Sequence, residues 1–449
     1  MRPHRPHAAR GARPARHRRA GADVDVNPVP PGLLPDTAEV LADGSLAIGG
    51  CRLDDLAAQY GTPLFVYDEA HLRARCREAV AAFGHGRAFY ATKAFLCGAM
   101  ARLAYEEGLL LDVASGGEMF VALHAGVPAD ALTLHGNNKS LSELRMAIEA
   151  GVRHIVVDSF DELDRLDALH AQGLPAPRVL VRITPGVHAH THEFIATGQD
   201  DSKFGFNLGN GDAHRAIDRM RRSSSVVLEG VHCHIGSNVF EASNFAKAAE
   251  VMAAFAVPLD LPHLVLGGGL GVAYVEGEEA PTITQWGNVL LDACSALGVR
   301  SAVSVEPGRS IVAAAAITVY EVGTVKHIPG VRTYVSVDGG MSDNPRPVLY
   351  GSGYEAFLPR DVRAVRSARA RIVGKHCESG DVLVFDAALP EGVAVGDLLC
   401  TPVTGAYGHS MASNYNKLPR PAVVFAADGE SRLVVRRETY EDLVRCDVV

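Results

Sequence analysis

Strand-like and helix-like segments alternate along residues 69–312, and this alternation limits the possible folds more than any other feature of the sequence. The expected strands are short apolar runs at 88–92, 109–114, 132–136, 154–158, 178–184, 228–236, 263–269 and 302–308. Amphipathic stretches such as 140–151 and 159–173 lie between them. Repetition of this unit about eight times predicts a (β/α)8 barrel. A doubly wound open sheet would show the same alternation, but the number of strands favours the barrel.

The sequence pattern changes after about residue 313, where short runs rich in Val and Thr are separated by Gly and Pro. This pattern predicts an antiparallel β domain, either a barrel or a sandwich. The apolar run 310–320 is expected to be a buried strand or core segment. The turn-linked stretch 31–68 could join the same sheet. The expected domains are therefore an α/β barrel over 69–312 and an all-β domain built from 31–68 and 313–449.

Composition indicates an ordinary globular chain. Of its 449 residues, 47% are hydrophobic and 21% charged, and no apolar run is long enough for a transmembrane helix. Eight scattered cysteines without a CxxC pair argue against a zinc ribbon or a disulfide scaffold and suit the cytoplasm. The first 30 residues form a basic arm, which is expected to be disordered. We expect neither a membrane nor a nucleic-acid partner.

Polar or glycine-rich clusters follow nearly every expected barrel strand. They are Lys93, "DVASGGE" (112–118), "HGNNKS" (135–140), "RITPG" (182–186), "HCHIGSN" (232–238), "GGGLG" (267–271) and "EPGR" (306–309). In a (β/α)8 barrel the carboxyl ends of the strands form one rim, which carries the active site. Lys93 is the most informative of these residues, because a lysine is rarely buried without a reason. We expect all seven segments to border one cavity.

Each of these segments is a weak signal by itself. The glycines of "GGGLG" could bind an anion through backbone N–H groups, or could only mark a tight turn. His232 and His234 fall on one strand face, but no further ligand lies at a suitable spacing, so hydrogen bonding or stacking is favoured over metal binding. Zinc is equally disfavoured at His190 and His192. No metal is therefore expected at the site.

Together the segments meet the requirements of pyridoxal 5'-phosphate. An amine at Lys93 can bind the cofactor aldehyde, the glycine-rich loop can hold the phosphate, and Glu306 can keep the pyridine nitrogen protonated. A lysine that is covalently joined to an aldehyde and surrounded by compensating charge can be accommodated inside a protein. The residues thus predict a pyridoxal phosphate enzyme.

From residue 45 to 445 the chain resembles the fold-type III pyridoxal phosphate decarboxylases, in particular those acting on meso-2,6-diaminopimelate. The resemblance is carried by "YATKAF", "DVASGGE", "HGNNKS", "HTHEFIATGQDDSKFGF", "HCHIGSN", "GGGLG", "EPGRSIV", "MSDNPRPVLY", "CESGD" and "GAYGHSMASNYN". It implies the decarboxylation of this diamino diacid to L-lysine and CO2, the last step of lysine biosynthesis. It also implies a homodimer with shared active sites.

The resemblance also implies the residues of the site. The cofactor would be bound by Lys93, His234, Ser237, Gly268, Gly269, Glu306, Arg309 and Tyr407. The substrate would be bound by Arg309, Arg346, Tyr350, Glu378 and Tyr407. Lys93 and Cys377 would be catalytic, with Cys377 giving a proton in the partner subunit's site. Arginine side chains suit a substrate that keeps a second carboxylate, because they bind carboxylates in a bidentate, permanently charged manner.

Several other functions are alternatives to this one. Racemases of the same fold class usually place an arginine where Glu306 stands, and the ornithine branch typically has Asp where Glu378 stands. Decarboxylases of arginine or carboxynorspermidine are closer rivals, which a substrate panel would separate. A catalytically dead relative is disfavoured because Lys93, Glu306 and Cys377 are all present. The sequence departs from the family pattern at Phe95 and His409, where relatives often have Asn and an aromatic residue.

Overall fold

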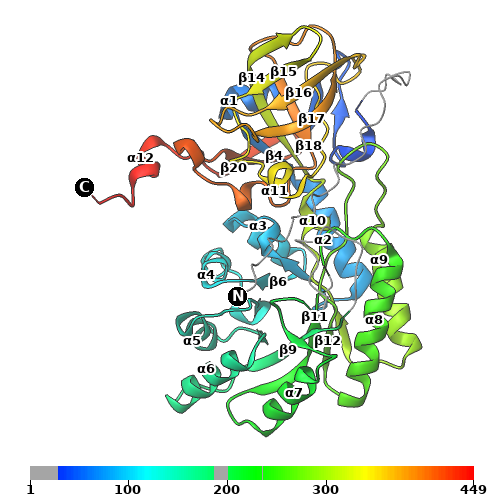
Figure 1. Ribbon diagram of the computed structural model, residues 1–449, viewed down its shortest axis with the longest axis vertical. Helices are drawn as coiled ribbons and strands as arrows, with labels where there is room; N and C mark the ends of the chain where they lie inside the picture. Colours follow the sequence, from blue (N-terminus) through cyan, green and yellow to red (C-terminus); the bar gives the residue numbers. More distant parts are fainter. Residues whose placement is uncertain (1–28, 187–200, 235, 449) are drawn as a thin grey trace, which may run out of the picture.

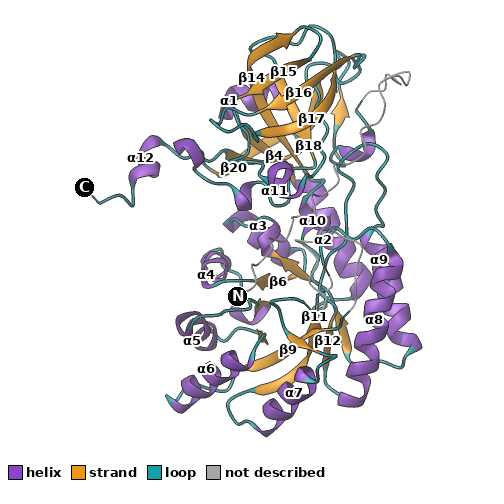
Figure 2. Cartoon of the chain, viewed as in Figure 1, coloured by secondary structure: helices purple, strands orange, loops and turns teal. Residues whose placement is uncertain are grey.

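The computed structural model describes residues 29–186, 201–234 and 236–448. A lower part consists of strands surrounded by helices, and an upper part consists mainly of strands (Figures 1 and 2). The basic arm and the pair His190 and His192 lie outside the described residues. Within the described residues, no helix combines the length and apolar character that crossing a bilayer requires.

The lower part is a closed parallel barrel. Its strands, in spatial order, are β5 (Phe89–Ala91), β6 (Leu110–Val113), β7 (Leu132–Leu134), β8 (His154–Val157), β9 (Arg178–Thr184), β11 (Val227–Cys233), β12 (His263–Val265) and β13 (Ala302–Ser304), with β10 (Phe206–Asn207) paired to β9. A parallel bridge between Ala88 and Val305 joins the last strand to the first, and the Phe89 N–H donates to the Val305 carbonyl at 2.8 Å. This closure confirms the predicted (β/α)8 barrel and excludes the open sheet.

Helices cover the outside of the barrel (Figure 2). They are α2 (Glu69–Phe83), α3 (Gly98–Glu106), α4 (Gly116–His124), α5 (Leu141–Ala150), α6 (Phe160–Ala171), α7 (Asp212–Arg222), α8 (Ala242–Ala256), α9 (Ile283–Ala296) and α10 (Arg309–Val312). Helix α5 shows why the predicted boundaries hold. Ser140 and Glu143 form a reciprocal capping box at its start, and Gly151 ends it with φ of 76°.

The upper part contains a mixed sheet rather than a purely antiparallel one. Its strands are β4 (Leu64–Asp68), β14 (Ala316–Ile328), β15 (Arg332–Val337), β16 (Ala368–Val373), β17 (Val382–Leu389), β18 (Leu398–Pro402), β19 (Ala422–Ala427) and β20 (Glu430–Val435). Most neighbours are antiparallel, but β15–β16 and β4–β19 are parallel. The antiparallel expectation was wrong for these two pairs, because their strands are joined by long connections instead of hairpins.

The segment before the barrel divides between two sheets. Only β4 of this segment joins the large sheet, whereas β1 (Glu39–Val40), β2 (Leu46–Ile48) and β3 (Cys51–Arg52) form a small sheet followed by α1 (Leu53–Tyr60). The remaining helices are α11 (Arg346–Tyr350), α12 (Tyr440–Val444) and the 3-10 turns η1 (Pro31–Leu33), η2 (Thr92–Ala94), η3 (Ala129–Ala131), η5 (Val257–Leu259), η6 (His409–Met411) and η7 (Tyr415–Lys417).

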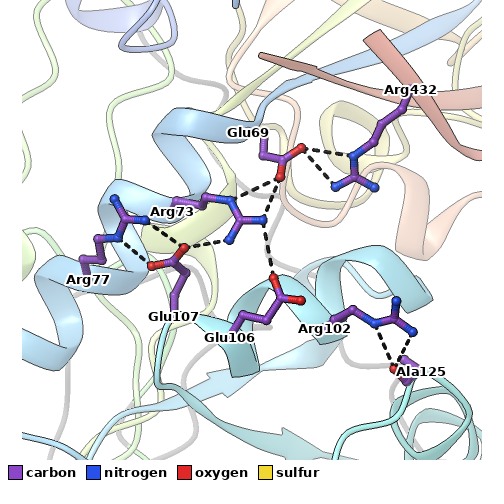
Figure 3. Close-up of polar contacts among 8 residues, drawn as sticks. All are labelled: Glu69, Arg73, Arg77, Arg102, Glu106, Glu107, Ala125 and Arg432. Atoms are coloured by element: carbon purple, nitrogen blue, oxygen red, sulfur yellow. Dashed lines mark hydrogen bonds and ion pairs between the residues drawn. The ribbon is translucent and has the colours of Figure 1, made fainter. Parts of the chain in front are cut away.

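A chain of ion pairs connects the upper part to the barrel helices (Figure 3). Arg432 of β20 contacts Glu69 at the start of α2, at 3.0 Å. Glu69 also contacts Arg73 at 2.8 Å, and Arg73 reaches Glu107, which follows α3, at 2.7 Å. Because Arg73 also lies 3.5 Å from Glu106, this arginine joins α2 to α3, and Glu69 joins α2 to a strand of the upper sheet.

Candidate active site

A cavity of about 1000 Å³ lies at the carboxyl ends of the barrel strands. It is lined by Lys93, Asp112, Ala114, His135, Gly136, Asn137, Arg182, Lys203, Phe204, His232, His234, Ser237, Asn238, Phe240, Tyr274, Glu278, Glu306, Arg309, Arg346, Tyr350, Gly351, Ser352, Gly353, Tyr407 and Met411. Every barrel segment singled out at a strand end contributes to this cavity or to the adjoining niche described below, which is what parallel strands of one barrel require.

Lys93 lies in η2 directly after β5, and its side chain lines the cavity. Burial opposes the charge of its ammonium group, but Asp112, Tyr407 and Glu306 outweigh burial and raise the pKa of Lys93. Asp112, at the end of β6, has its own pKa raised to about 6, mainly by burial. The lysine thus lies in a cavity together with two carboxyl groups, those of Asp112 and Glu306.

Glu306 follows β13 and is held by two histidines. Its Oε2 lies 3.0 Å from Nε2 of His232, and its Oε1 lies 3.1 Å from Nε2 of His135. Burial would raise the pKa of Glu306, but these two imidazoles outweigh it and hold that pKa well below its usual range. Burial lowers the pKa of His232 to about 4, whereas Asp112 and Glu306 raise that of His135. The result is a buried carboxylate that stays ionised.

The glycine-rich turn after β12 brings three backbone segments together. A Cβ added at Gly268 would lie 2.2 Å from the Glu306 carbonyl oxygen, and one at Gly269 would lie 2.3 Å from the Gly236 carbonyl oxygen. The Gly268 N–H donates to Nδ1 of His234 at 3.2 Å. Glycine is therefore required here by close approach of backbone, and the turn fixes the positions of both Glu306 and His234.

A niche of about 60 Å³ adjoins the cavity, and Lys93, Ser237, Gly269, Arg309 and Ser310 are among the residues that line it. Arg309 donates to the Ser237 hydroxyl at 2.8 Å. Nε of Arg309 and the hydroxyl of Ser310 are buried and have no hydrogen-bond partner among the described residues. A small niche with a guanidinium and unpaired donors beside a glycine turn suits a phosphate group, so these residues fit pyridoxal phosphate.

Arginine and tyrosine side chains, including Arg309, form another part of the cavity wall. Arg309 donates to the Tyr274 hydroxyl at 2.6 Å and lies 4.9 Å from the ring centroid of Tyr407. Arg346, at the start of α11, donates to the Tyr354 hydroxyl at 3.0 Å and lies 4.3 Å from the Tyr274 ring. Both guanidinium groups are largely buried and oriented by phenol rings, so this wall can bind a carboxylate.

Two expected site residues lie elsewhere in this chain. Cys377 and Glu378 follow β16, are exposed and do not line the cavity. The backbone N–H of Cys377 donates to the side chain of Asn416 at 2.9 Å. The other residues expected at the site, including Ser237, His234, Tyr350 and Tyr407, line the cavity or the niche, except that Gly268 contributes through the turn behind it.

The two departures from the family pattern pack together. The ring centroids of Phe95 and His409 lie 5.8 Å apart with the planes at 89°, and Phe95 stacks on Tyr67 at 4.5 Å. The Tyr407 N–H donates to the Ala94 carbonyl at 2.8 Å. The aromatic pair therefore packs next to the backbone contact between Ala94 and Tyr407.

Sequence reasoning missed several cavity residues. Asp112, His135 and Arg182 belong to segments that were identified as clusters, but their individual roles depend on neighbours from other strands. Tyr274 and Glu278 lie in the loop after the glycine turn, where no periodicity marks them. The sequence did contain a signal for His135, because "HGNNKS" follows an expected strand in the same way as the segments that contain Lys93 and Glu306.

Comparisons with known proteins identify the family. The family model described as "Pyridoxal-dependent decarboxylase, pyridoxal binding domain" matches residues 69–313. The diaminopimelate decarboxylase of Bacillus subtilis is 48% identical over 430 residues, covering 92% of this chain and 98% of that protein. That of Mycobacterium tuberculosis is 47% identical over 425 residues, covering 90% and 95%.

Solved structures agree with these sequence relatives. The diaminopimelate decarboxylase of M. jannaschii in complex with L-lysine superposes with a TM-score of 0.85 at 34% identity, covering 92% of this chain and 98% of that one. The Helicobacter pylori enzyme with L-lysine gives 0.79 at 31% identity, covering 87% and 98%. The chain therefore belongs to the pyridoxal-dependent decarboxylases and, within them, to the diaminopimelate decarboxylases.

Proposed function

We propose that this enzyme decarboxylates meso-2,6-diaminopimelate to L-lysine and CO2 in the cytoplasm, as a homodimer with shared active sites. The observation that carries the substrate assignment is the pair of buried arginines, Arg309 and Arg346, in the same cavity as Lys93 and Glu306. A substrate with an amino-acid group at each end keeps one carboxylate through the reaction, and a buried guanidinium is its natural partner.

Bound pyridoxal phosphate supplies an electron sink for the electron pair that decarboxylation leaves behind. Lys93 would hold the aldehyde carbon of the cofactor until a substrate amine replaces it. Glu306 would keep a proton on the pyridine nitrogen, because its carboxylate is ionised and held by His232 and His135. His234 would stack on the ring.

The phosphate and the substrate would be bound by different residues, except for Arg309, which borders the niche and also contacts Tyr274 beside Arg346. Ser237, Gly269 and Arg309 border the niche that suits the phosphate. Arg346 and Tyr350, at the two ends of α11, would bind the carboxylate that is retained. Arg346 is already oriented by Tyr354, so little side-chain entropy remains to be lost when the substrate binds.

The reaction also needs a proton donor, and we assign this role to Cys377 of the partner subunit. A thiol can give a proton to carbon and regain one near neutral pH. Cys377 and Glu378 are exposed in this chain and do not line its own cavity, which supports a role across a subunit interface.

A substrate panel tests the reaction directly. CO2 release should be measured with meso-diaminopimelate, ornithine and arginine, and we expect turnover of the first only. Lys93→Ala should lose the absorbance of the bound cofactor together with turnover, whereas Lys247→Ala, which changes an exposed lysine of α8, should retain both. Release of CO2 from ornithine at a comparable rate would refute the substrate assignment.

Subunit mixing tests the shared site. Lys93→Ala and Cys377→Ala damage different components, so a mixed dimer would contain one site with neither change. Random mixing in equal amounts should restore about one quarter of the wild-type activity, because half of the dimers are mixed and each has one intact site. Mixed samples that remain as inactive as the separate variants would show that Cys377 acts in its own chain or not at all.

A further inference from the structure

Three potential metal ligands gather at the end of the barrel opposite the cavity. His154 is the first residue of β8, His263 is the first residue of β12, and Glu229 lies near the start of β11. Side chains alternate along a strand, so His154 shares a face with Val156, and His263 shares a face with Val265. Val156 and Val265 pack with Leu180 in a small buried cluster. The two histidines therefore form the next layer of side chains along the same faces.

Glu229 enters this layer through an irregularity of β11. The register of β11 against β9 shifts between Leu228 and Gly230, so that Glu229 is an inserted, bulged residue. A bulge changes the direction of a side chain and is often found next to a site. At Gly230 an added Cβ would lie 2.4 Å from the His263 carbonyl oxygen, so glycine is required for β12 to approach this closely.

The three side chains are already close enough to share an ion. Nε2 of His154 lies 2.8 Å from Oε2 of Glu229, and the His154 and His263 ring centroids lie 5.1 Å apart. One ligand atom from each of the three residues falls within 4.8 Å of the others. His154 is 3% exposed, and its buried Nδ1 has no hydrogen-bond partner within the part of the chain that the structure describes. Such an orphaned nitrogen needs an explanation.

We propose that His154, Glu229 and His263 form a binding site for a divalent transition metal, with zinc as the best match. Two imidazoles and one carboxylate are a known zinc ligand set, with water in the fourth position. Glu229 and His263 are partly exposed, so that both an entry path and a water ligand are available. The described residues contain one other such group, His135, His232 and Glu306, and it belongs to the cofactor cavity.

Three arginines near this group, Arg153, Arg87 and Arg178, oppose the binding of a cation. Arg87 and Arg178 are exposed, so solvent and salt screen their repulsion of a metal ion, whereas Arg153 is half-buried. The carboxylate of Glu229 supplies the negative charge that offsets this repulsion.

The position of the group indicates a structural role. The amino-terminal face of such barrels contributes to stability, and catalysis takes place at the other face. A metal here would join β8, β11 and β12, and binding to the folded state alone would raise the melting temperature. Decarboxylation would continue at its usual rate when the site is emptied.

The test is a zinc titration of the full chain with its cofactor bound and without an affinity tag. Wild type is compared with Glu229→Gln and His263→Asn, which alter partly exposed residues, and with His327→Asn, which removes an exposed histidine of β14. Other histidines, including those of residues 1–28 and 188–192, can bind zinc weakly. The difference between variants is therefore the measurement. Calorimetry gives stoichiometry and affinity, and visible absorption of cobalt(II) gives the coordination.

Wild type and His327→Asn should bind one zinc per chain more tightly, by about 100-fold or more, than either ligand variant. This expectation rests on the 10- to 100-fold cost of losing even an outer partner of a metal ligand. Zinc should also raise the melting temperature of these two proteins only. Equal stoichiometry, affinity and thermal shift in all four proteins would overturn the proposal, as would the absence of zinc binding by wild type.

Discussion

Replacing Lys139 with Met should destabilise the barrel strongly, although Lys139 itself does not line the cavity. Its ammonium group donates to both carboxylate oxygens of Glu162, at 2.8 and 3.0 Å, and to the carbonyls of Gly136 and Val156. The side chains of Lys139 and Glu162 are 2% and 1% exposed. The pair fixes the loop that carries His135 to the cavity.

The structure sets the size of the effect. In Lys139→Met the carboxylate of Glu162 keeps a backbone donor at Asp158 but loses its counter-ion, and two carbonyls lose their donor. Removal of one partner of a buried ion pair costs about 3–5 kcal/mol. For a barrel of this size, where 1 kcal/mol shifts the midpoint by about 2–4 °C, the melting temperature should fall by about 6–20 °C.

The only tryptophan of the chain provides the assay. Trp286 lies in α9, is 1% exposed and packs against Phe83 and Phe245, so its fluorescence reports unfolding of the barrel. The melting temperature of Lys139→Met should be compared with that of Lys247→Met, which removes an exposed charge and should melt within about 2 °C of wild type.

The pH dependence has a definite sign. Burial already raises the pKa of Glu162, and loss of the Lys139 ammonium would raise it further above the unfolded value. The folded variant then binds more protons than the unfolded chain between these two pKa values, so its stability falls as pH rises through that window. The loss of stability of Lys139→Met relative to wild type should therefore be smaller at pH 5.5 than at pH 8. A deficit independent of pH, or a Lys139→Met/Glu162→Leu protein no more stable than Lys139→Met, would refute the reasoning.

Three further predictions concern the site and its support. Gly268→Ala places a Cβ 2.2 Å from the Glu306 carbonyl oxygen and should weaken cofactor binding at least tenfold in a spectrophotometric titration, whereas Gly117→Ala, with a nearest contact of 3.7 Å, should not. Glu306→Gln should retain the cofactor absorbance but lower kcat by about 100- to 1,000-fold, the usual cost of one preorganised charge partner. Arg432→Ala breaks the exposed pair with Glu69 and should cost less than about 1 kcal/mol, a difference that 1 M salt should abolish in thermal melts.

The regular parts of the barrel could be predicted because they depend on local pattern. The strand expected at 178–184 is β9 to the residue, whereas those expected at 263–269 and 302–308 end at Val265 and Ser304. These two stop early because the glycine turn and the "EPG" segment leave the sheet to enter the rim. The hydrophobic pattern identified the strands, but where each strand ends depends on the residues that leave the sheet to form the site.

The remaining features depend on contacts between distant residues, which no local pattern reveals. The histidine pair on Glu306 joins segments from β7, β11 and β13, and the parallel pairing of β4 with β19 joins residues more than 350 positions apart. Cys377 is a further case, because its proposed target belongs to another copy of the chain. The resemblance to a family named Glu306 and Cys377 as candidates but neither histidine of the pair, and only the assembled fold brings Glu306, His135 and His232 together.

The closure of the barrel between Ala88 and Val305 has a consequence for synthesis of the chain. Lys93 leaves the ribosome more than 200 residues before Glu306, yet the two line one cavity only because the last strand pairs with the first. A nascent chain that stops before residue 305 has the amine but neither the carboxylate nor the niche beside Arg309. The cofactor site therefore forms only after the last barrel strand has paired with the first. Binding of pyridoxal phosphate can then stabilise only barrels that have already closed.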